Sequence, residues 1–491
     1  MALLASYFAA HLLFAQTPAE QGREFILQSQ QAALDGDAVT ATRLLEQGLD
    51  FPLSAAFLDT LFLEIDDLLT DSDREALKDA QSKTAWLKQF WRRLDPTPAT
   101  PENERYMEHY KRLAYAREHY PSARSRGYDD RGMIYIRYGP PDESYIQPSD
   151  NFFRGTESWL YRRLGGVNFD FVELGATYEL ISDFQRALVA VPSDVHDQIR
   201  IMRDLFADRS ELGLIYSRVY ERLQQELDQE TQGGKSPDLM LVNSLMNQYA
   251  TEVENLHEQL PQSTTSIGRE TQPLIFGFSY ARFFQDNGQN RLELYFGVPL
   301  KELKFISRDS TNLTSTLKLA FRVLDENMNV VVQDKKTYPL AATSQAELDT
   351  TDYVGQLTCF LPHGKYRVAV QLSNPESQKR QFYTLRLQLP DFATNQLLLS
   401  DLQFAKKVLA DTVHIVENRD SSPASGFYKH GIYVEPYPYL ILSAHQAVDL
   451  YYEIYNLARG KNGRCNYRID YKITSEKSPG GLKRLLKAVN P

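Results

Sequence analysis

Residues 130–142 read DRGMIYIRYGPPD. The run Met133–Tyr138 consists of apolar and aromatic side chains around one arginine, which predicts a buried strand. A glycine and two prolines follow at residues 139–141, so the strand is expected to end in a turn there. Further strands are expected at Ser158–Tyr161, Val167–Val172 and Thr177–Leu180, with a hairpin turn at Gly165-Gly166. Together they predict a small antiparallel sheet in an α+β domain over residues 96–190.

The chain before this domain has the spacing of helices. Apolar residues recur at intervals of three and four between residues 20 and 95, which indicates a helical region. Thr70-Asp71-Ser72-Asp73 offers side-chain oxygens to the first N–H groups of one of these helices. Pro96 and Pro98 end the region, because proline lacks a backbone donor.

After the α+β domain the chain is expected to form helices first and then strands. Ser193 is expected to begin a long helix that reaches about Asp228, and a second helix gives a helical hairpin over residues 191–265. From Thr271 the apolar period changes from 3.6 to 2, and seven short strands predict an immunoglobulin-like β-sandwich over residues 270–392. A second β-sandwich-like domain is expected at 400–475, followed by a tail at 476–491. The second β domain has too few strands to form a closed sandwich, so either the chain continues past Pro491 or the open edge of this domain is covered.

The expected fold class is therefore α+β and multidomain. The chain has 491 residues, of which 42% are hydrophobic and 24% charged, and this composition excludes disorder for most of the length. The net charge of −10 argues against nucleic acid or an anionic membrane as the main partner. Two cysteines exclude a disulfide scaffold and a cysteine-rich metal site. Whether Cys359 and Cys465 pair with each other is left open.

The N-terminus has the pattern of a targeting segment. Residues 1–15 are uncharged and mostly apolar, and the polar chain begins at Thr17. A run of roughly 14 apolar residues is too short to span a membrane but suits a signal peptide at residues 1–16. The alternative is a short apolar helix docked on the first domain. Export would place the protein in the periplasm, at the outer-membrane surface or outside the cell, and no transmembrane helix is expected.

Two sequence blocks, FWRRLDPTP at residues 90–98 and DRG…YIRYGPPD at 130–142, resemble a known family. The stretch from Thr70 to about Leu180 is similar to the GWxTD-domain family, exported bacterial proteins without an established activity. The resemblance implies that residues 96–190 are a GWxTD-like domain, with its motif region starting near residue 70, and that β-sandwich segments follow it. The residues that carry it, all expected to be structural, are Phe90, Trp91, Arg92, Asp95, Pro96, Glu104, Tyr110, Arg117, Asp130, Arg131, Gly132, Tyr138, Gly139, Pro140, Asp142 and Trp159.

The motif that names the family is altered here. Instead of Gly-Trp-any-Thr-Asp, the chain has Arg126-Gly127-Tyr128-Asp129-Asp130, so the final Asp matches while the Trp and the Thr do not. If the indole or the hydroxyl carried a function, this chain has lost it. If they only pack, Tyr128 can substitute.

Acidic residues are the only candidates for catalysis. Asp130, Asp142 and Glu104 could act as acid and base on a glycan. A strand between Asp130 and Asp142 would, however, hold them roughly 25 Å or more apart, whereas a glycosidase pair needs about 5–10 Å. The favoured interpretation is that these groups cap turns and bind arginines. No catalytic triad, phosphate loop or metal-ligand spacing is present, so no metal or cofactor is expected.

These observations favour a binding or scaffolding protein of the cell envelope. Its β-sandwich surfaces would face a protein or glycan partner, without catalysis. The alternative is a glycan-acting hydrolase that uses the acids of the GWxTD-like domain, and a third possibility is an accessory factor in secretion. The sequence leaves the partner and the oligomeric state open.

Overall fold

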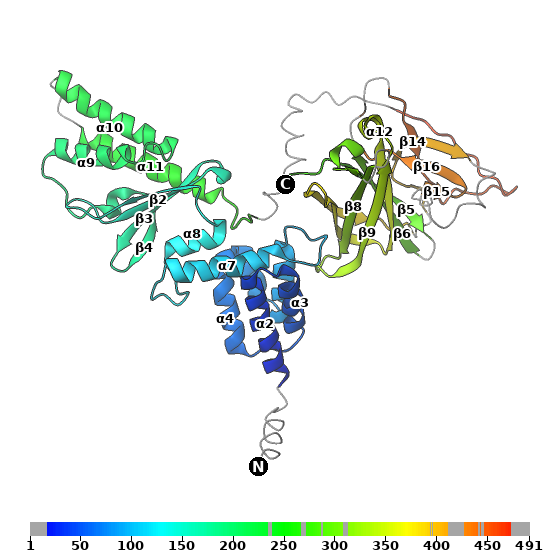
Figure 1. The fold of residues 1–491 in the computed structure, drawn as a ribbon, viewed down its shortest axis with the longest axis horizontal. Coiled ribbons are helices and arrows are strands. Elements are labelled where there is room, and N and C mark those ends of the chain that lie inside the picture. The colour runs from blue at the N-terminus through cyan, green and yellow to red at the C-terminus, as the bar shows by residue number, and fades with distance from the viewer. Residues whose placement is uncertain are drawn as a thin grey trace, which may run out of the picture. The chain divides into compact units, whose positions relative to one another are not determined.

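The structure is a computed structural model that describes residues 17–233, 238–266, 272–285, 288–307, 313–392, 394, 396–410, 427–439, 442 and 446–472. The expected signal peptide and the tail after residue 475 lie outside the described residues. The chain divides into two compact units. Unit 1 comprises residues 1–275, 299–351 and 365–387, and unit 2 comprises residues 276–298, 352–364 and 388–491. Helices dominate the N-terminal part and strands the C-terminal part, so the mixed fold class is confirmed (Figure 1).

Unit 1 begins with packed helices, as the apolar spacing predicts. They are α2 (Pro18–Asp35), α3 (Ala38–Leu49), α4 (Ala55–Ile65), α5 (Asp71–Lys78), α6 (Lys83–Leu94) and α7 (Glu104–His119). The expected cap at Thr70 is confirmed, because its side chain and that of Asp73 form a capping box. Trp91 and Tyr106 lie at the centre of the core, with their rings edge to face. No helix in the described part of the chain has the length and apolar composition that a membrane span requires.

The run Met133–Tyr138, expected to be a strand, is instead part of helix α8 (Asp130–Tyr138). The prediction was wrong because groups distant in the sequence bind the end of this helix. Asp129 caps its first N–H groups, while Arg112 and Arg163 donate to the carbonyl oxygens of residues 136–138 at 2.7–3.1 Å. An acid at the N-terminus and cations at the C-terminus stabilise the helix dipole. These contacts override the strand preference of the Ile and Tyr side chains.

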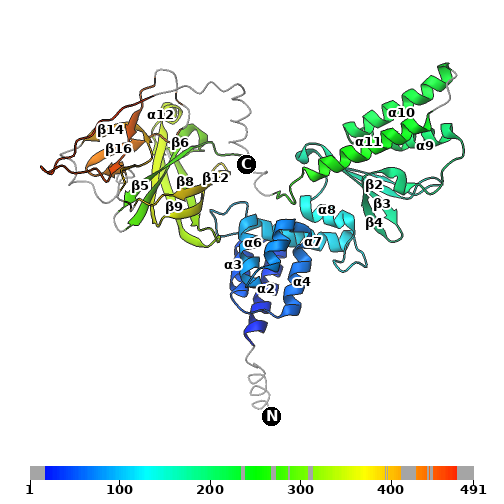
Figure 2. The same ribbon diagram turned by 180° about the vertical axis from the view of Figure 1, so that it is seen from behind.

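A four-stranded antiparallel sheet follows α8. Its strands are β1 (Glu143–Gln147), β2 (Thr156–Tyr161), β3 (Val167–Leu174) and β4 (Thr177–Ile181), in the order β1-β2-β3-β4. The three strands expected after residue 150 are confirmed, and β1 is an additional one. Trp159 and Phe171 on one face pack with Ile134 of α8. Leu160 and Val172 on the other face pack with the next group of helices, so the sheet is covered on both sides (Figure 2).

The helices that cover this second face are α9 (Val195–Ala207), α10 (Leu214–Gly233) and α11 (Leu239–Glu258). The single helix expected from Ser193 to Asp228 is wrong, because the chain breaks it at residues 208–213. There Arg209 turns fully into the core, where its guanidinium donates to the hydroxyls of Ser158 and Thr156. A buried arginine is tolerated only with such partners.

A second sheet of unit 1 has the order β12-β11-β8-β7, and β9 also pairs with β8. Its elements are β7 (Ile306–Ser307), β8 (Leu313–Leu324), β9 (Val330–Ala342), β11 (Gly364–Asn374) and β12 (Lys379–Leu389), with α12 (Gln345–Thr350) after β9. The apolar alternation expected after Thr271 is thus present as strands. The immunoglobulin-like arrangement expected for residues 270–392 stays a prediction.

Unit 2 contains the remaining strands. One sheet has the order β10-β6-β5, and another has the order β15-β16-β14-β17, while β13 pairs with β18. The bounds are β5 (Gly277–Gln285), β6 (Gln289–Pro299), β10 (Asp352–Leu361), β13 (Leu398–Leu399), β14 (Gln403–Ala410), β15 (Tyr428–Lys429), β16 (Ile432–Pro436), β17 (Asp449–Tyr451) and β18 (Ile454–Tyr455). Phe283 of β5 and Val434 of β16 share one core. The unit therefore groups the strands differently from the ranges 270–392 and 400–475 expected from the sequence.

The core of unit 2 holds a buried cation. Lys429 donates to the hydroxyl of Tyr295 at 3.1 Å, pairs with Glu293, and lies over the ring of Phe283. Burial lowers the pKa of Lys429 to about 8. Cys359 and Cys465 are free thiols, and burial raises the pKa of Cys359 to about 12, so this thiol is unreactive at neutral pH.

Candidate functional site

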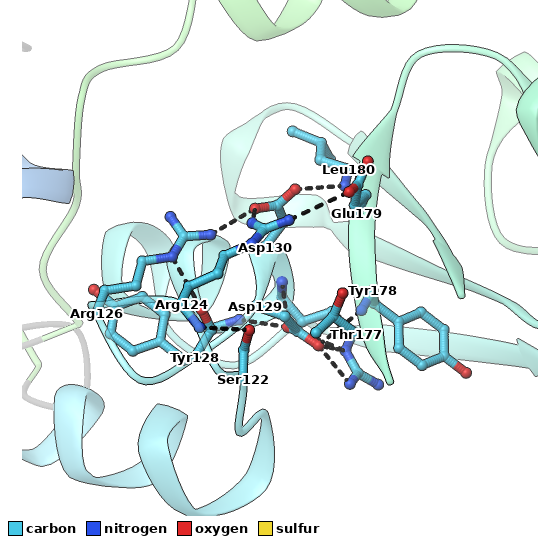
Figure 3. Close-up of polar contacts among 12 residues, drawn as sticks. Ser122, Arg124, Arg126, Tyr128, Asp129, Asp130, Thr177, Tyr178, Glu179 and Leu180 are labelled. Atoms are coloured by element: carbon cyan, nitrogen blue, oxygen red, sulfur yellow. Dashed lines mark hydrogen bonds and ion pairs between the residues drawn. The ribbon is translucent and has the colours of Figure 1, made fainter. Parts of the chain in front are cut away.

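The candidate site is the loop at residues 121–130, here called the motif loop, which joins α7 to α8. A bridge between Pro121 and Tyr128 closes the loop at its base. Inside it, Gly127 adopts a positive φ of 85° and its N–H donates to the carbonyl oxygen of Arg124 at 2.8 Å. The loop ends directly beside β4, and side chains from both segments meet there (Figure 3).

Asp129 is the buried anchor of the motif loop. Its side chain is fully buried and accepts a hydrogen bond from the backbone N–H of Arg131 at 2.9 Å, which caps α8. The other carboxylate oxygen accepts from Nη2 of Arg131 at 2.8 Å and from the backbone N–H of Tyr178 at 3.1 Å. The carboxylate is thus fully used by structural partners.

Asp130 occupies the first turn of α8 and contacts three groups. One oxygen accepts from Arg124 Nη1 at 2.5 Å and from Arg126 Nη2 at 2.6 Å. The other accepts from the backbone N–H of Leu180 at 2.9 Å. Two guanidinium groups of the motif loop therefore converge on one carboxylate, whose second oxygen binds β4 (Figure 3).

The two carboxylates together close the free edge of a sheet. β4 is the last strand in the order β1-β2-β3-β4, and its backbone on the side away from β3 needs other partners. Tyr178 and Leu180 alternate along β4, so their N–H groups point to the same side. Asp129 and Asp130 accept both of these hydrogen bonds. The motif loop takes the place that a neighbouring strand would have.

Tyr128 fills the core beneath the motif loop. Its ring is buried, and its hydroxyl donates to a carboxylate oxygen of Asp67 at 2.8 Å. Gly132 of α8 lies against this ring so closely that a Cβ there would be 2.7 Å from the Cβ of Tyr128. Gly132 is thus required by packing, and Tyr128 acts as a core residue.

Arg131 connects the motif loop to the sheet. Its guanidinium lies 3.7 Å from the centre of the Tyr178 ring and pairs with Glu157 of β2 at 3.0 Å. Glu157 in turn accepts from the indole N–H of Trp159 at 2.6 Å. Arg131 and the indole of Trp159 therefore belong to one polar network.

The three acids proposed for catalysis are held in separate places. Asp130 and Asp142 lie at opposite ends of α8, because residue 130 begins this helix and residue 142 follows it. A nine-residue helix is about 13 Å long, and Asp142 pairs with Arg163 at 3.3 Å. Glu104 lies in the first turn of α7. Asp130 and Asp142 are thus closer together than a strand would have held them. Each of these two aspartates, however, has an arginine partner.

Glu104 belongs to a pair of buried acids. Its carboxylate accepts from the hydroxyl of Thr97, and burial raises its pKa. Asp95 accepts from the backbone N–H of Thr97 at 2.9 Å. Burial, with a contribution from the charge of Glu104, raises the pKa of Asp95 to about 8. These two acids of the motif region have raised pKa values, whereas the pKa values of Asp73 and Glu108 are lowered.

The other predicted residues have structural positions. Phe90, Trp91 and Tyr110 are buried in the helical core, and Tyr138 and Trp159 are buried between α8 and the sheet. Arg92 pairs with Glu46 at 2.6 Å, and Arg117 pairs with Glu64 at 3.4 Å. Pro96 and Pro140 lie in loops, and Gly139 ends α8 with a positive φ of 78°.

Sequence reasoning missed Asp129 and Asp67. Asp129 precedes a run that looks like a strand, and only a helical interpretation of that run would have identified it as a cap. Asp67 lies outside the recognised blocks, and its contact with Tyr128 spans 61 residues. No local pattern could have paired the two.

Comparison with known proteins gives the family. Residues 31–182 match the family described as the GWxTD domain. The chain contains a GWxTD domain. The domain begins within α2, before the start near residue 70 inferred from the motifs, and ends directly after β4. Both sides of the contact between the motif loop and β4 therefore lie inside it.

The contacts of the motif loop account for the substitutions in the sequence motif that names the GWxTD family. Where the family name has Thr, this chain has Asp129, and both residue types are good helix caps. The Trp is missing, and the buried aromatic ring of the loop is that of Tyr128. The final Asp of the name is Asp130, which binds β4.

Other comparisons add little to the GWxTD domain. No curated protein matches the sequence. Among solved structures, the crystal structure of a protein described as ApaA from Bordetella pertussis is similar at 9% identity, with a TM-score of 0.17. The similarity covers 24% of this chain and 98% of the other. At this TM-score the likeness implies neither a shared fold nor a shared function.

Proposed function

We propose that this protein is an exported binding or scaffolding protein of the cell envelope, without catalytic activity. One observation carries the proposal. The polar residues of the GWxTD motif are engaged in fixing the motif loop, as the pairing of Asp130 with Arg124 and Arg126 illustrates. A catalytic carboxylate needs access to substrate, whereas these carboxylates serve as braces.

The partner, a protein or a glycan, would bind a β-sandwich surface of unit 2. Support comes from exposed apolar side chains on the sheet that contains β14. Phe404 and Leu450 are direct cross-strand partners on β14 and β17, and their exposed fractions are 45% and 43%. Leu402 precedes them on the chain and is also exposed. Clustered apolar side chains of this kind are typical of interaction surfaces.

Export is part of the same proposal. The uncharged apolar run at residues 1–15 supports it. Cell fractionation combined with mass spectrometry of the N-terminus tests it. We expect the protein in the periplasm, at the outer-membrane surface or outside the cell, beginning near Gln16 or Thr17. An intact Met1 on a cytoplasmic protein would contradict export.

The binding role is tested by mild cross-linking in the native envelope, followed by purification and identification of partners. We expect a reproducible stoichiometric partner that is lost in the Phe404→Ser/Leu450→Ser double variant. The control is Val331→Ser, which changes a similarly exposed side chain on β9. A chain that purifies alone, or equal loss of the partner in the control, would contradict the proposed surface.

One observation favours the alternative, a glycan-acting hydrolase. The raised pKa values of Glu104 and Asp95 are those that a general acid requires. A hydrolysis screen on envelope glycans tests this, with Glu104→Gln, Asp130→Asn and Asp142→Asn as variants. Activity lost only in Glu104→Gln would support the hydrolase, whereas no activity in the unmodified chain would count against it.

A further inference from the structure

An open pocket in unit 2 lies beside the turn between β15 and β16. Its volume is about 460 Å³, within the range of small-molecule sites. The residues that line it all belong to unit 2, and each of them is at least partly exposed. Its apolar walls are Phe284, Ile454 and Tyr455, and its polar side chains are Gln285, Arg291, His430 and Glu453.

The carboxylate of Glu453 keeps a free acceptor position in this pocket. Its oxygen Oε1 accepts from Nη2 of Arg291 at 2.6 Å and from the hydroxyl of Tyr451 at 2.9 Å. Its oxygen Oε2 accepts only from the hydroxyl of Tyr455, at 2.8 Å, among the described residues. A carboxylate oxygen can accept two hydrogen bonds. Because 11% of the Glu453 side chain is exposed, a ligand can reach it.

Arg291 offers a donor next to that acceptor. Its Nε lies 2.9 Å from a carboxylate oxygen of Glu293, and its Nη2 binds Glu453. Its Nη1 has no partner in the described part of the chain and is not among the buried polar atoms. Arg291 and the neighbouring Lys429 carry two positive charges that the two glutamates balance. The pocket therefore pairs a donor with an acceptor and favours neither cations nor anions.

The aromatic wall of the pocket is held rigidly. The hydroxyl of Tyr455 donates to Glu453 and accepts from the backbone N–H of Phe284 at 2.9 Å. The rings of Phe284 and Tyr455 lie edge to face, with 5.6 Å between their centres. Aromatic faces carry negative charge density and attract C–H groups, such as those on one face of a sugar ring.

The rim of the pocket contains a strained histidine. His430 and Gly431 form the two-residue turn between β15 and β16, with φ angles of 48° and 79°. Such a turn favours Asn-Gly, and a histidine at positive φ costs free energy. Its Nε2 lies 3.5 Å from Oε1 of Glu453. Strain of this kind is concentrated at functional sites, so the imidazole is a further candidate contact for a ligand.

We propose that this pocket binds the terminal ring of a neutral glycan. One ring hydroxyl donates to Oε2 of Glu453, and the adjacent hydroxyl accepts from Nη1 of Arg291. A C–H face of the ring packs against Tyr455, and His430 binds a further hydroxyl. The inference rests on the binding function proposed above and deepens it, because it names a glycan as the partner. The pocket is not lined by the exposed apolar side chains of β14 and β17.

Calorimetric titration and saturation-transfer NMR on the full chain test the proposal. Methyl β-D-glucopyranoside, methyl α-D-mannopyranoside and methyl β-D-galactopyranoside present the end of a glycan with three hydroxyl geometries. Tetrahydropyran-2-methanol has the ring without adjacent hydroxyls, and methyl β-D-glucuronide adds a carboxylate. We expect at least one neutral glycoside to bind at least tenfold more tightly than tetrahydropyran-2-methanol. Binding of none of them, equal binding of tetrahydropyran-2-methanol, or tightest binding of the glucuronide would overturn the proposal.

Variants locate the binding and separate it from folding. Arg291→Lys keeps the charge but loses Nη1, and should weaken the tightest glycoside by roughly tenfold or more. His430→Asn installs the favoured Asn-Gly turn, so it should maintain or raise the melting temperature while it weakens binding. His363→Asn is the matched control, because His363 is an exposed histidine before Gly364 in the turn between β10 and β11, outside the pocket. It should leave the affinity unchanged.

The outcomes distinguish this pocket from the general binding function. Glycoside affinity that stays unchanged in both Arg291→Lys and His430→Asn would overturn the pocket, although a glycan-binding role at another surface would stand. Equal weakening in His363→Asn would also overturn it. Absence of sugar binding together with a cross-linked protein partner would refute the glycan inference and leave the proposed function intact.

Discussion

The carboxylate of Asp130 accepts a hydrogen bond from the backbone N–H of Leu180 at 2.9 Å, across 50 residues of chain. Asp129 binds the N–H of Tyr178 on the same strand. The altered GWxTD motif is therefore a clamp between the start of α8 and the edge of β4. The role explains why a motif rich in charge lies in a largely buried place.

Replacement of Asp129 by alanine is expected to destabilise the protein by about 2–4 kcal/mol, because Arg131 would lose one of its two carboxylate partners and α8 its cap. Asp129→Thr, which restores the residue of the family name, retains the cap and should lose less. Chemical denaturation of both variants measures the difference. As a control, Asp37→Ala removes an exposed helix cap and should cost only about 1 kcal/mol. Equal losses in Asp129→Ala and Asp37→Ala would show that Asp129 is a cap and nothing more.

Tyr128→Phe tests the contact beneath the loop. The variant keeps the ring in the core but removes the donor to the buried carboxylate of Asp67. We expect a loss of about 1–3 kcal/mol in the free energy of unfolding, because the carboxylate is left without that partner. Tyr128→Phe in an Asp67→Asn background should cost clearly less. A full loss in both backgrounds would mean that the hydroxyl acts through another group.

The effect of Gly132→Ala on stability should have the opposite sign from that of the usual glycine-to-alanine exchange in a helix. Glycine inside a helix normally costs about 1 kcal/mol relative to alanine. Here the new Cβ would lie 2.7 Å from the Cβ of Tyr128, so overpacking should destabilise the protein by roughly 1–3 kcal/mol. In a Tyr128→Ala background the same exchange should be neutral or stabilising. Thermal melts of the four proteins measure this coupling.

Asp95 should make stability depend on pH. Its pKa is raised from 3.8 to about 8, so between these values the folded state binds the proton and the unfolded state does not. The free energy of unfolding should therefore fall as the pH rises through this window, by at most about 1.4 kcal/mol per pH unit. Urea denaturation of the chain and of Asp95→Asn at pH 5 and pH 7.5 measures the slope. The slope should be smaller in Asp95→Asn and unchanged in the exposed control Asp59→Asn.

Local sequence patterns predicted the elements whose stability is local. The cap at Thr70 and the strands β2 to β4 follow from side chains within a few residues of one another. Residues 133–138 were misassigned because the partners that make them helical, among them Arg112 and Arg163, lie well outside the run. Composition alone could not reveal such partners.

The candidate site was predicted only in part, because some of its deciding contacts also join residues that are distant in the sequence. The Arg–carboxylate interpretation of Asp130 and Asp142 agrees with the ion pairs they form. Asp129 was not singled out, although it is the most buried acid of the motif loop. Its importance comes from β4, and the register of an edge strand against a loop cannot be read from the loop's own residues.

The clamp between the motif loop and β4 also bears on the order of folding. Closing a loop of about 50 residues costs conformational entropy before any contact is gained. A nascent chain that ends before Tyr178 lacks both N–H groups that Asp129 and Asp130 bind. In such a chain Asp129, Arg112 and Arg163 can already stabilise α8, but the motif loop has no strand edge to bind. The contact between the motif loop and β4 should therefore form late, after helix α8.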